Sequence, residues 1–231
     1  MFFDPMYIVL VLLPGLAISG LASLMVKVAF NRYSKVRSIR GLTGAQAAQI
    51  LLDQAGIHDV RIVPAHGFLS DHYNPLSKEL ALSEQVYNSN SVAAIGVATH
   101  EAGHAIQHAT HYFPLWARSA LVPLASIGSN LGLLVMAVGL AFSQTVVLVG
   151  AVLFGAVLLF QLVTLPVEFN ASSRAKRLVV EAGIVYPEER IGIDAVLNAA
   201  AMTYVAAAVS TLLTLLYYLW RAGLIGGSRD E

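Results

Sequence analysis

The chain has 231 residues, no cysteine and a formal net charge of zero. Hydrophobic residues make up 57% and charged residues only 12%, whereas a soluble domain carries about 25% charged residues. We therefore expect a membrane protein, and the balanced charge, without a basic run interleaved with aromatics, argues against a nucleic-acid partner. The lack of cysteine excludes disulfides, thiolate metal ligands and a cysteine nucleophile.

The first long apolar run covers residues 6–30. It is long enough to span a bilayer, which needs about 20 residues. A cleaved signal peptide is the alternative, but the start of the chain carries Asp4 and lacks the usual basic residues. We therefore expect a retained transmembrane helix.

A short soluble segment follows this run. Thr43 and Gln46 can form a capping box at the start of an amphipathic helix over residues 43–55. Residues 60–64 and 79–83 resemble short strands separated by turn-forming residues. We predict a small β-element ahead of the next helix.

The next helix, predicted over residues 91–108, contains His100-Glu101-Ala102-Gly103-His104. Two histidines four residues apart lie on one helical face, about one turn apart, so both imidazoles can reach one metal ion. Glu101 follows the first histidine directly. The pattern H-E-x-x-H on a helix is typical of zinc metalloproteases, in which the glutamate is the general base.

Three further apolar runs follow. Residues 121–142 and 145–165 are separated only by Ser143 and Gln144, which predicts a tight transmembrane hairpin. Residues 195–220 form the last run. We predict a mainly α membrane protein with about four transmembrane helices and a small α+β, zincin-like catalytic portion built on the HExxH helix. The predicted regions are transmembrane helix 1 (1–30), the catalytic portion (31–118), the hairpin (119–165), a polar segment (166–194), and transmembrane helix 4 with the tail (195–231).

The basic residues predict the orientation of these spans. Eight Lys and Arg lie from Lys27 to Arg118 and four from Arg174 to Arg190, so 12 of the 14 fall on one side of a four-span topology. The positive-inside rule places that side in the cytoplasm. Both polar regions, 31–118 and 166–194, then share the cytoplasmic side, and both termini lie outside.

A catalytic zinc ion takes three protein ligands, and HExxH supplies two. His108 continues the spacing, but it lies roughly 12 Å along the helix from His100, too far to share one ion. Nothing in their spacing marks His66 or His72 as ligands. Glu168 directly follows the third apolar run, where a carboxylate at the bilayer boundary should have a partner. A helix-start glutamate favoured by the helix dipole is the alternative.

Five stretches resemble bacterial membrane zinc metallopeptidases of the YugP type, the neutral zinc metallopeptidase type 2 family. They are DHYNP (71–75), LALSEQVY (80–87), AAIGVATHEAGHAIQH (93–108), LPVEFNASSRA (165–175) and AAAMTYVAAA (199–208). The chain is more distantly similar to HtpX-type and CAAX prenyl proteases, in which HExxH is followed by E-F-x-A-D. The resemblance implies a gluzincin-like site with one zinc ion on His100, His104 and Glu168, and Glu101 as catalytic base. Ser172 stands where the distant relatives have Asp, and it could hydrogen-bond a ligand.

These features predict an integral membrane zinc endopeptidase of the bacterial inner membrane, with its active site facing the cytoplasm. Peptides or membrane proteins are the expected substrates, and the lipid bilayer is the expected surroundings. Tyr204 or His108 could stabilise the oxyanion, although Tyr204 could equally be a core or interfacial residue. Residues 79–83 could offer an exposed strand edge to a peptide.

Two other functions are compatible with parts of the sequence. An inactive membrane scaffold or assembly factor could keep a structural metal site, but such a site needs no general base, so the intact Glu101 argues against it. A metal transporter would need ionisable residues inside its spans, and the apolar core of residues 145–165 has none. The sequence identifies neither the physiological substrate nor the oligomeric state.

Overall fold

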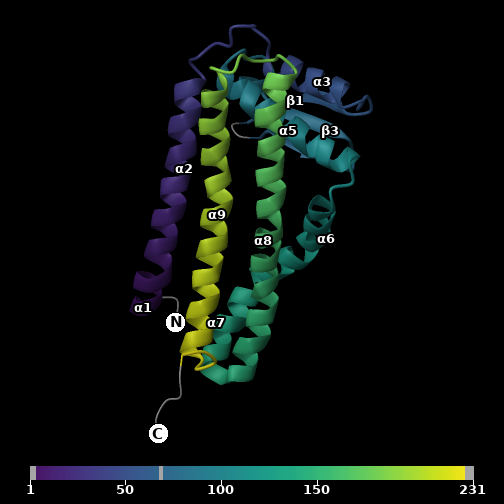
Figure 1. Ribbon diagram of the computed structural model, residues 1–231. Coiled ribbons are helices and arrows are strands. Elements are labelled where there is room, and N and C mark those ends of the chain that lie inside the picture. The colour runs from purple at the N-terminus through teal and green to yellow at the C-terminus, as the bar shows by residue number, and fades with distance from the viewer. Residues whose placement is uncertain (1–3, 68–69, 227–231) are drawn as a thin grey trace. The chain divides into compact units, whose positions relative to one another are not determined.

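The computed structural model describes residues 4–67 and 70–226 and is mainly helical, with one small sheet (Figure 1). The helices and strands in chain order are α1 (Pro5–Tyr7), the π-helical segment η1 (Ile8–Leu12), α2 (Leu13–Tyr33), α3 (Gly44–Gln54), β1 (Arg61–Ala65), β2 (His72–Asn74), β3 (Glu79–Ser83), α4 (Glu84–Tyr87), α5 (Val92–Ala109), α6 (Phe113–Ile127), the π-helical segment η2 (Gly128–Gly132), α7 (Leu133–Phe142), α8 (Gln144–Glu181) and α9 (Arg190–Arg221).

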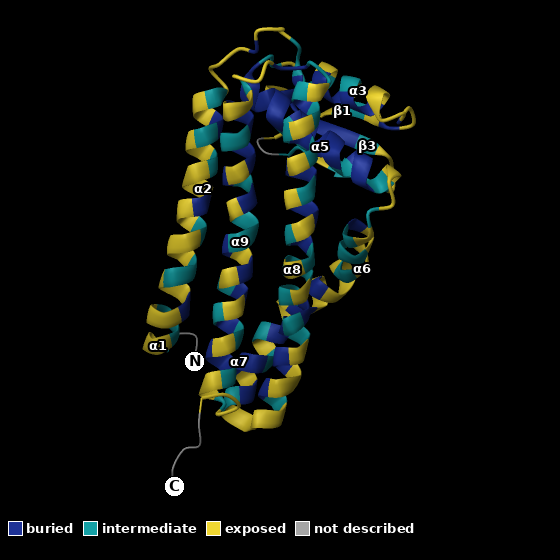
Figure 2. Cartoon of the chain, in the orientation of Figure 1, coloured by how far each residue is buried: buried dark blue, intermediate teal, exposed yellow. Residues whose placement is uncertain are grey.

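Four helical stretches are long and apolar enough to cross a membrane. They are Pro5–Tyr33, Phe113–Phe142, Gln144–Glu181 and Arg190–Arg221. Exposed positions recur along α2, α8 and α9 (Figure 2), and they include Leu16, Leu21 and Val152, each more than half exposed. Contiguous exposed apolar side chains are what a lipid-facing helix presents. The prediction of a mainly α membrane protein with a small α+β portion is confirmed.

The third spanning helix is longer than its apolar run. α8 continues through Pro166 to Glu181, although proline removes one backbone hydrogen-bond donor from a helix interior. Spanning helices tolerate proline because neighbouring groups satisfy the freed carbonyl. The polar residues after Pro166 are therefore a continuation of α8, and Glu168 lies on an unbroken helix.

Contacts within the chain divide it into two compact units. The helical unit consists of the chain as far as Ala22, Ala117–Leu165, and the chain from Thr203 onward. The sheet unit consists of Ser23–Trp116 and Pro166–Met202. The sheet unit thus joins the segment that carries HExxH to the part of α8 that carries Glu168.

In the helical unit, α7 and the first half of α8 form the tight hairpin that the sequence predicts. Ser143, in an extended conformation, is the one residue between the two helices. A Cβ added at Gly132 would lie 2.6 Å from the backbone nitrogen of Phe154, and one added at Gly150 would lie 2.5 Å from that of Met136. Glycine is required at these points because the two backbones approach so closely.

In the sheet unit, the three strands have the order β1-β3-β2. β3 runs parallel to β1, with Glu79 opposite Arg61, and antiparallel to β2, with Ala81 opposite His72. The prediction that residues 79–83 form an exposed edge is therefore wrong. β3 is the central strand, and the outer strands are β1 and β2.

The core of the sheet unit joins α3, β3 and α5. α3 begins at the predicted capping box, in which the Thr43 hydroxyl accepts from the Gln46 backbone and the Gln46 side chain accepts from the Thr43 backbone. α5 contacts α3 and also lies against β2 and β3 (Figure 1). The largest fully buried side chains of this core include Leu51, Leu52, Leu80, Leu82 and Ile95. Their burial fixes α5 in the sheet unit.

Candidate metal centre

The HExxH motif lies in the C-terminal half of α5. The helix begins after Ser91, whose hydroxyl accepts a hydrogen bond from the Ala94 backbone, an N-cap that satisfies one free amide. The small residues of its first half are fully buried. This packing carries the motif into the interior, so the side chains of His100 and His104 are only 14% and 12% exposed.

Three side chains converge at this point. Glu168 Oε2 lies 3.2 Å from His100 Nε2 and 3.6 Å from His104 Nε2, and the Glu168 side chain is 4% exposed. The two imidazole rings stand nearly perpendicular, at 83°, with centroids 4.7 Å apart. The ligand-type atoms of all three residues lie within 4.8 Å of one another. In the described part of the chain they form the one such cluster of three or more potential metal ligands.

These distances fit a zinc ion. Zinc takes tetrahedral coordination with bonds of about 2.0–2.1 Å to imidazole nitrogen and carboxylate oxygen, which separates neighbouring ligand atoms by about 3.3 Å. Glu168 Oε2 is also buried without a hydrogen-bond partner among the described residues, despite the two nearby nitrogens. A buried carboxylate oxygen that lacks a well-directed donor needs another partner. A cation between the three atoms would satisfy it.

The far nitrogen of each histidine is hydrogen-bonded. His100 Nδ1 lies 3.2 Å from Ser172 Oγ, and His104 Nδ1 lies 3.0 Å from Gln107 Oε1. Such bonds fix the orientation of a metal-binding imidazole and leave its Nε2 for the ion. From its place in the family pattern, we expected Ser172 to hydrogen-bond a metal ligand. The structure places its hydroxyl beside His100, one of the proposed ligands.

Gln107 was missed by the sequence analysis. It is fully buried, and its amide nitrogen donates to the Val167 carbonyl at 2.8 Å and to Asn170 Oδ1 at 3.0 Å. One side chain therefore holds His104 and also ties α5 to the turn of α8 that carries Glu168. The available signal was its place about one helical turn after His104, but its partner Val167 lies 60 residues away.

The two helices also touch through their backbones. A Cβ added at Gly103 would lie 2.8 Å from the carbonyl oxygen of Ala171, so only glycine fits between α5 and α8 there. Gly103 occupies a variable position of HExxH, and its role here is close packing. Gln107 and Gly103 together bring Glu168 within reach of both histidines.

Glu101 lies beside this cluster and is 8% exposed. It forms no side-chain hydrogen bond or ion pair with the residues that the structure describes, so its carboxylate is available to a substrate or a water molecule. Burial disfavours the charged form of His104, but the neighbouring carboxylates of Glu168 and Glu101 outweigh it and raise the pKa of His104.

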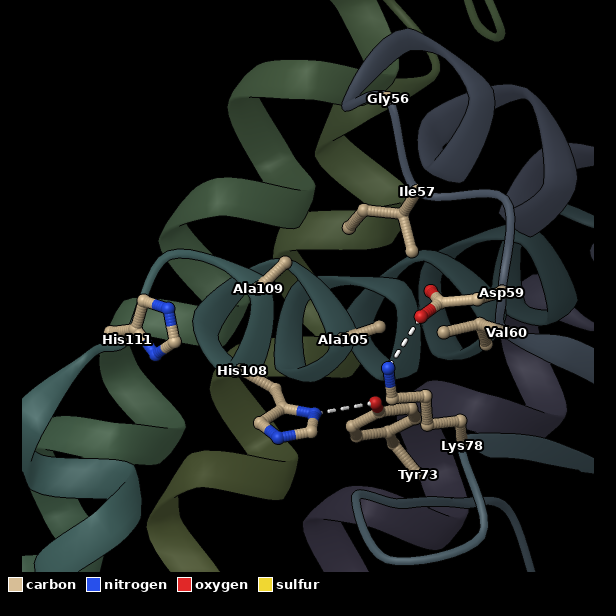
Figure 3. A pocket seen from close by; sticks show the side chains of 10 residues that line it. All are labelled: Gly56, Ile57, Asp59, Val60, Tyr73, Lys78, Ala105, His108, Ala109 and His111. Atoms are coloured by element: carbon tan, nitrogen blue, oxygen red, sulfur yellow. Dashed lines mark hydrogen bonds and ion pairs between the residues drawn. The ribbon is translucent and has the colours of Figure 1, made fainter.

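The other histidines considered in the sequence lie apart from the cluster. His108 Nδ1 is 2.8 Å from the Tyr73 hydroxyl (Figure 3). His66 pairs with Glu84 at the surface, and His72 Nδ1 lies 2.8 Å from a backbone carbonyl oxygen. Neither His66 nor His72 belongs to the cluster.

Two residues were expected to stabilise an oxyanion, His108 and Tyr204. His108 points to Tyr73, and Tyr204 falls in the helical unit, whereas the cluster belongs to the sheet unit. A role for either residue in the reaction stays a prediction.

Comparison with known proteins identifies the family. Residues 7–223 match the model of the family described as "Putative neutral zinc metallopeptidase". The chain is 42% identical over 227 residues to the "Putative membrane protease YugP" of Bacillus subtilis (strain 168), an alignment that covers 98% of this chain and 100% of that protein. No solved structure matches the chain. The family name implies zinc as the metal for the His100, His104 and Glu168 cluster. The chain therefore belongs to the neutral zinc metallopeptidase family.

Proposed function

We propose that the chain is an integral membrane zinc endopeptidase that hydrolyses peptide bonds in peptides or membrane proteins. One observation carries this proposal: His100, His104 and Glu168 converge to zinc-ligand spacing, and Glu101 lies beside them with a free carboxylate. A structural zinc site would have four protein ligands. With three protein ligands, the fourth coordination position stays open for water or substrate, and Glu101 lies next to it as a base.

Each residue then has a defined task. A bound zinc ion would polarise the substrate carbonyl and acidify the attacking water. Glu101 takes the proton from that water and delivers it to the leaving amine. Ser172 and Gln107 hold the two histidine rings so that both Nε2 atoms face the same point.

The proposed setting is the bacterial inner membrane, with the sheet unit in the cytoplasm and both termini outside. The support is the charge distribution: 11 of 14 basic residues fall in the two predicted cytoplasmic regions, and Lys27 lies at the cytoplasmic end of the first predicted span. Because the chain has no cysteine, single cysteines report topology without background. A membrane-impermeant maleimide should label Ser143→Cys in intact cells and Ser77→Cys only after permeabilisation; the reverse pattern would invert the topology.

The activity is tested with Glu101→Gln. This variant should bind as much zinc as the wild type, because Glu101 is not a ligand, and should lose casein hydrolysis by a factor of about 10²–10⁴, the usual contribution of a general base. Zinc is measured by elemental analysis and hydrolysis by release of labelled fragments, both on protein purified in detergent.

Glu181→Gln is the matched control, because it makes the same substitution at an exposed carboxylate paired with Arg177. It should retain both zinc and activity. Normal proteolysis by Glu101→Gln would refute the assignment of the base. A zinc-loaded wild type that cleaves no protein or peptide would instead favour a membrane scaffold with a structural metal.

A further inference from the structure

A second feature of the sheet unit is a cavity of about 310 Å³ beside the C-terminal end of α5 (Figure 3). None of the three proposed zinc ligands lines it. Its polar lining residues come from the segment before β1, from β2, from the turn before β3, from α5 and from the turn after α5; they are Asp59, Tyr73, Lys78, His108 and His111. The proposed reaction gives none of these five a task.

Tyr73 and His108 supply a hydrogen-bond donor to the cavity. The Tyr73 hydroxyl and His108 Nδ1 are 2.8 Å apart. If Tyr73 donates this bond, the neutral His108 ring keeps a proton on Nε2; if His108 donates it, the Tyr73 hydroxyl proton is free. In either arrangement the pair presents one further donor. Burial raises the pKa of Tyr73, so its phenol keeps its proton at neutral pH.

Lys78 adds a cation to these donors. Its ammonium pairs with Asp59 across the cavity lining (Figure 3), with side chains 47% and 63% exposed. An ion pair this exposed is weak, because water solvates both partners when they separate. Asp59 can return to solvent and leave Lys78 to an anionic ligand.

The backbone is also unusual at two points of this lining. Within residues 4–67 and 70–226, two non-glycine residues have positive φ, Lys78 at 52° and His111 at 51°. Both line the same cavity. Such conformations are costly for residues with a Cβ and concentrate at functional sites. Here they belong to the two basic side chains that flank the Tyr73 and His108 pair.

We propose that this cavity is a substrate subsite that binds a carboxylate, supplied by an acidic side chain or by the C-terminus of the peptide. The inference rests on the proposed peptidase function. His108 follows His104 by one helical turn, about 6 Å along α5. An extended peptide advances about 3.3 Å per residue, so the bound carboxylate belongs to a residue about two positions from the cleaved bond.

Paired peptides test this assignment. Peptides that the wild type releases from casein are identified by mass spectrometry and resynthesised with Glu or Gln at each position within about three residues of the cut. At one position, kcat/KM should be about tenfold higher for Glu, the effect of one charge-assisted hydrogen bond. Peptides that end near the cut, made as free acids and as amides, separate a terminal carboxylate from an internal one.

Three variants locate the preference. Lys78→Gln should abolish it, Tyr73→Phe should reduce it, and Asp59→Asn should keep or increase it by freeing Lys78. Arg61→Gln is the matched control, because it removes another exposed, paired basic side chain of the sheet and leaves the cavity intact. Zinc content equal to wild type verifies that each variant is folded.

The outcomes separate the two proposals. Cleavage with equal rates for Glu and Gln at every position, or a preference that survives in both Lys78→Gln and Tyr73→Phe, overturns the subsite alone. A zinc-loaded wild type that cleaves no peptide overturns the peptidase function. In that case the zinc-loaded wild type is titrated calorimetrically with synthetic peptides of one casein segment that carry Glu or Gln at each position in turn, and equal affinity at every position overturns the subsite.

Discussion

Replacing Gln107 by leucine tests whether one buried amide assembles the metal site. Leucine fills most of the same space, so the change removes hydrogen bonds rather than packing. The His104 Nδ1 donor and the Val167 carbonyl lose their partner, whereas Asn170 Oδ1 still accepts from Arg174 at 2.8 Å. Two buried groups left unsatisfied, at about 1–3 kcal/mol each, lower the free energy of unfolding by about 2–6 kcal/mol.

The same change should weaken zinc binding. The loss of a hydrogen bond that orients a metal-binding imidazole typically costs about 10–100-fold in affinity. Here the tie between α5 and α8 is lost as well, so we expect the upper part of this range. The dissociation constant is measured by competition with a chromophoric chelator in detergent, and stability by the thermal midpoint of the zinc-free protein.

Gln49→Leu is the control for this experiment. It makes the same substitution on the exposed surface of α3, where the side chain donates to Asp53 Oδ1, and it should leave zinc affinity unchanged. If Gln107→Leu binds zinc as tightly as Gln49→Leu does, the orientation of His104 does not depend on this amide, and the reasoning fails.

Four further predictions concern the same cluster and the packing around it. Glu168→Ala should lower zinc affinity by more than about 100-fold, since it removes a ligand rather than a supporting group; full zinc occupancy in this variant would exclude Glu168. Zinc affinity should fall on acidification from a pH above 6.5, because the pKa of His104 is raised above that value despite burial and zinc needs the neutral ring. The stability of the zinc-free protein should depend on pH in the opposite direction. The stabilisation from protonated His104 is complete below pH 6.5 and is lost as the pH rises through the raised pKa. Thermal melts at several pH values would detect this loss. Gly103→Ala should destabilise the fold by about 1–3 kcal/mol, because its Cβ would meet the Ala171 carbonyl at 2.8 Å. An unchanged melting temperature would show that α5 and α8 can move apart at no cost in stability.

The elements defined by local signals could be predicted from the sequence. The capping box at Thr43 and the helical spacing of the HExxH motif predicted helices that agree closely with α3 and α5. Apolar length alone identified the four candidate spans. In each case the information lies within one turn or one run of residues, so no knowledge of the tertiary structure is needed.

The features that depend on distant contacts could not be predicted. β2 has three residues, too few for an alternating pattern, and the central position of β3 follows from its pairing on both sides. Pro166 reads locally as a helix end, yet α8 passes through it, because a spanning helix is held by its surroundings. Gln107 looks like an ordinary polar residue near a helix end until its partner Val167 is known.

The three histidines of α5 are equally spaced along the chain, but the tertiary structure gives them different partners. His100 and His104 meet Glu168, and His108, one turn later, meets Tyr73 instead. A straight helix cannot bring His100 and His108 to one ion, since about 12 Å of axis separates them. The same rigidity fixes the distance from the zinc cluster to the proposed carboxylate subsite. A preference for acidic residues should therefore act at one position relative to the cleaved bond, and it should not follow the total charge of the peptide.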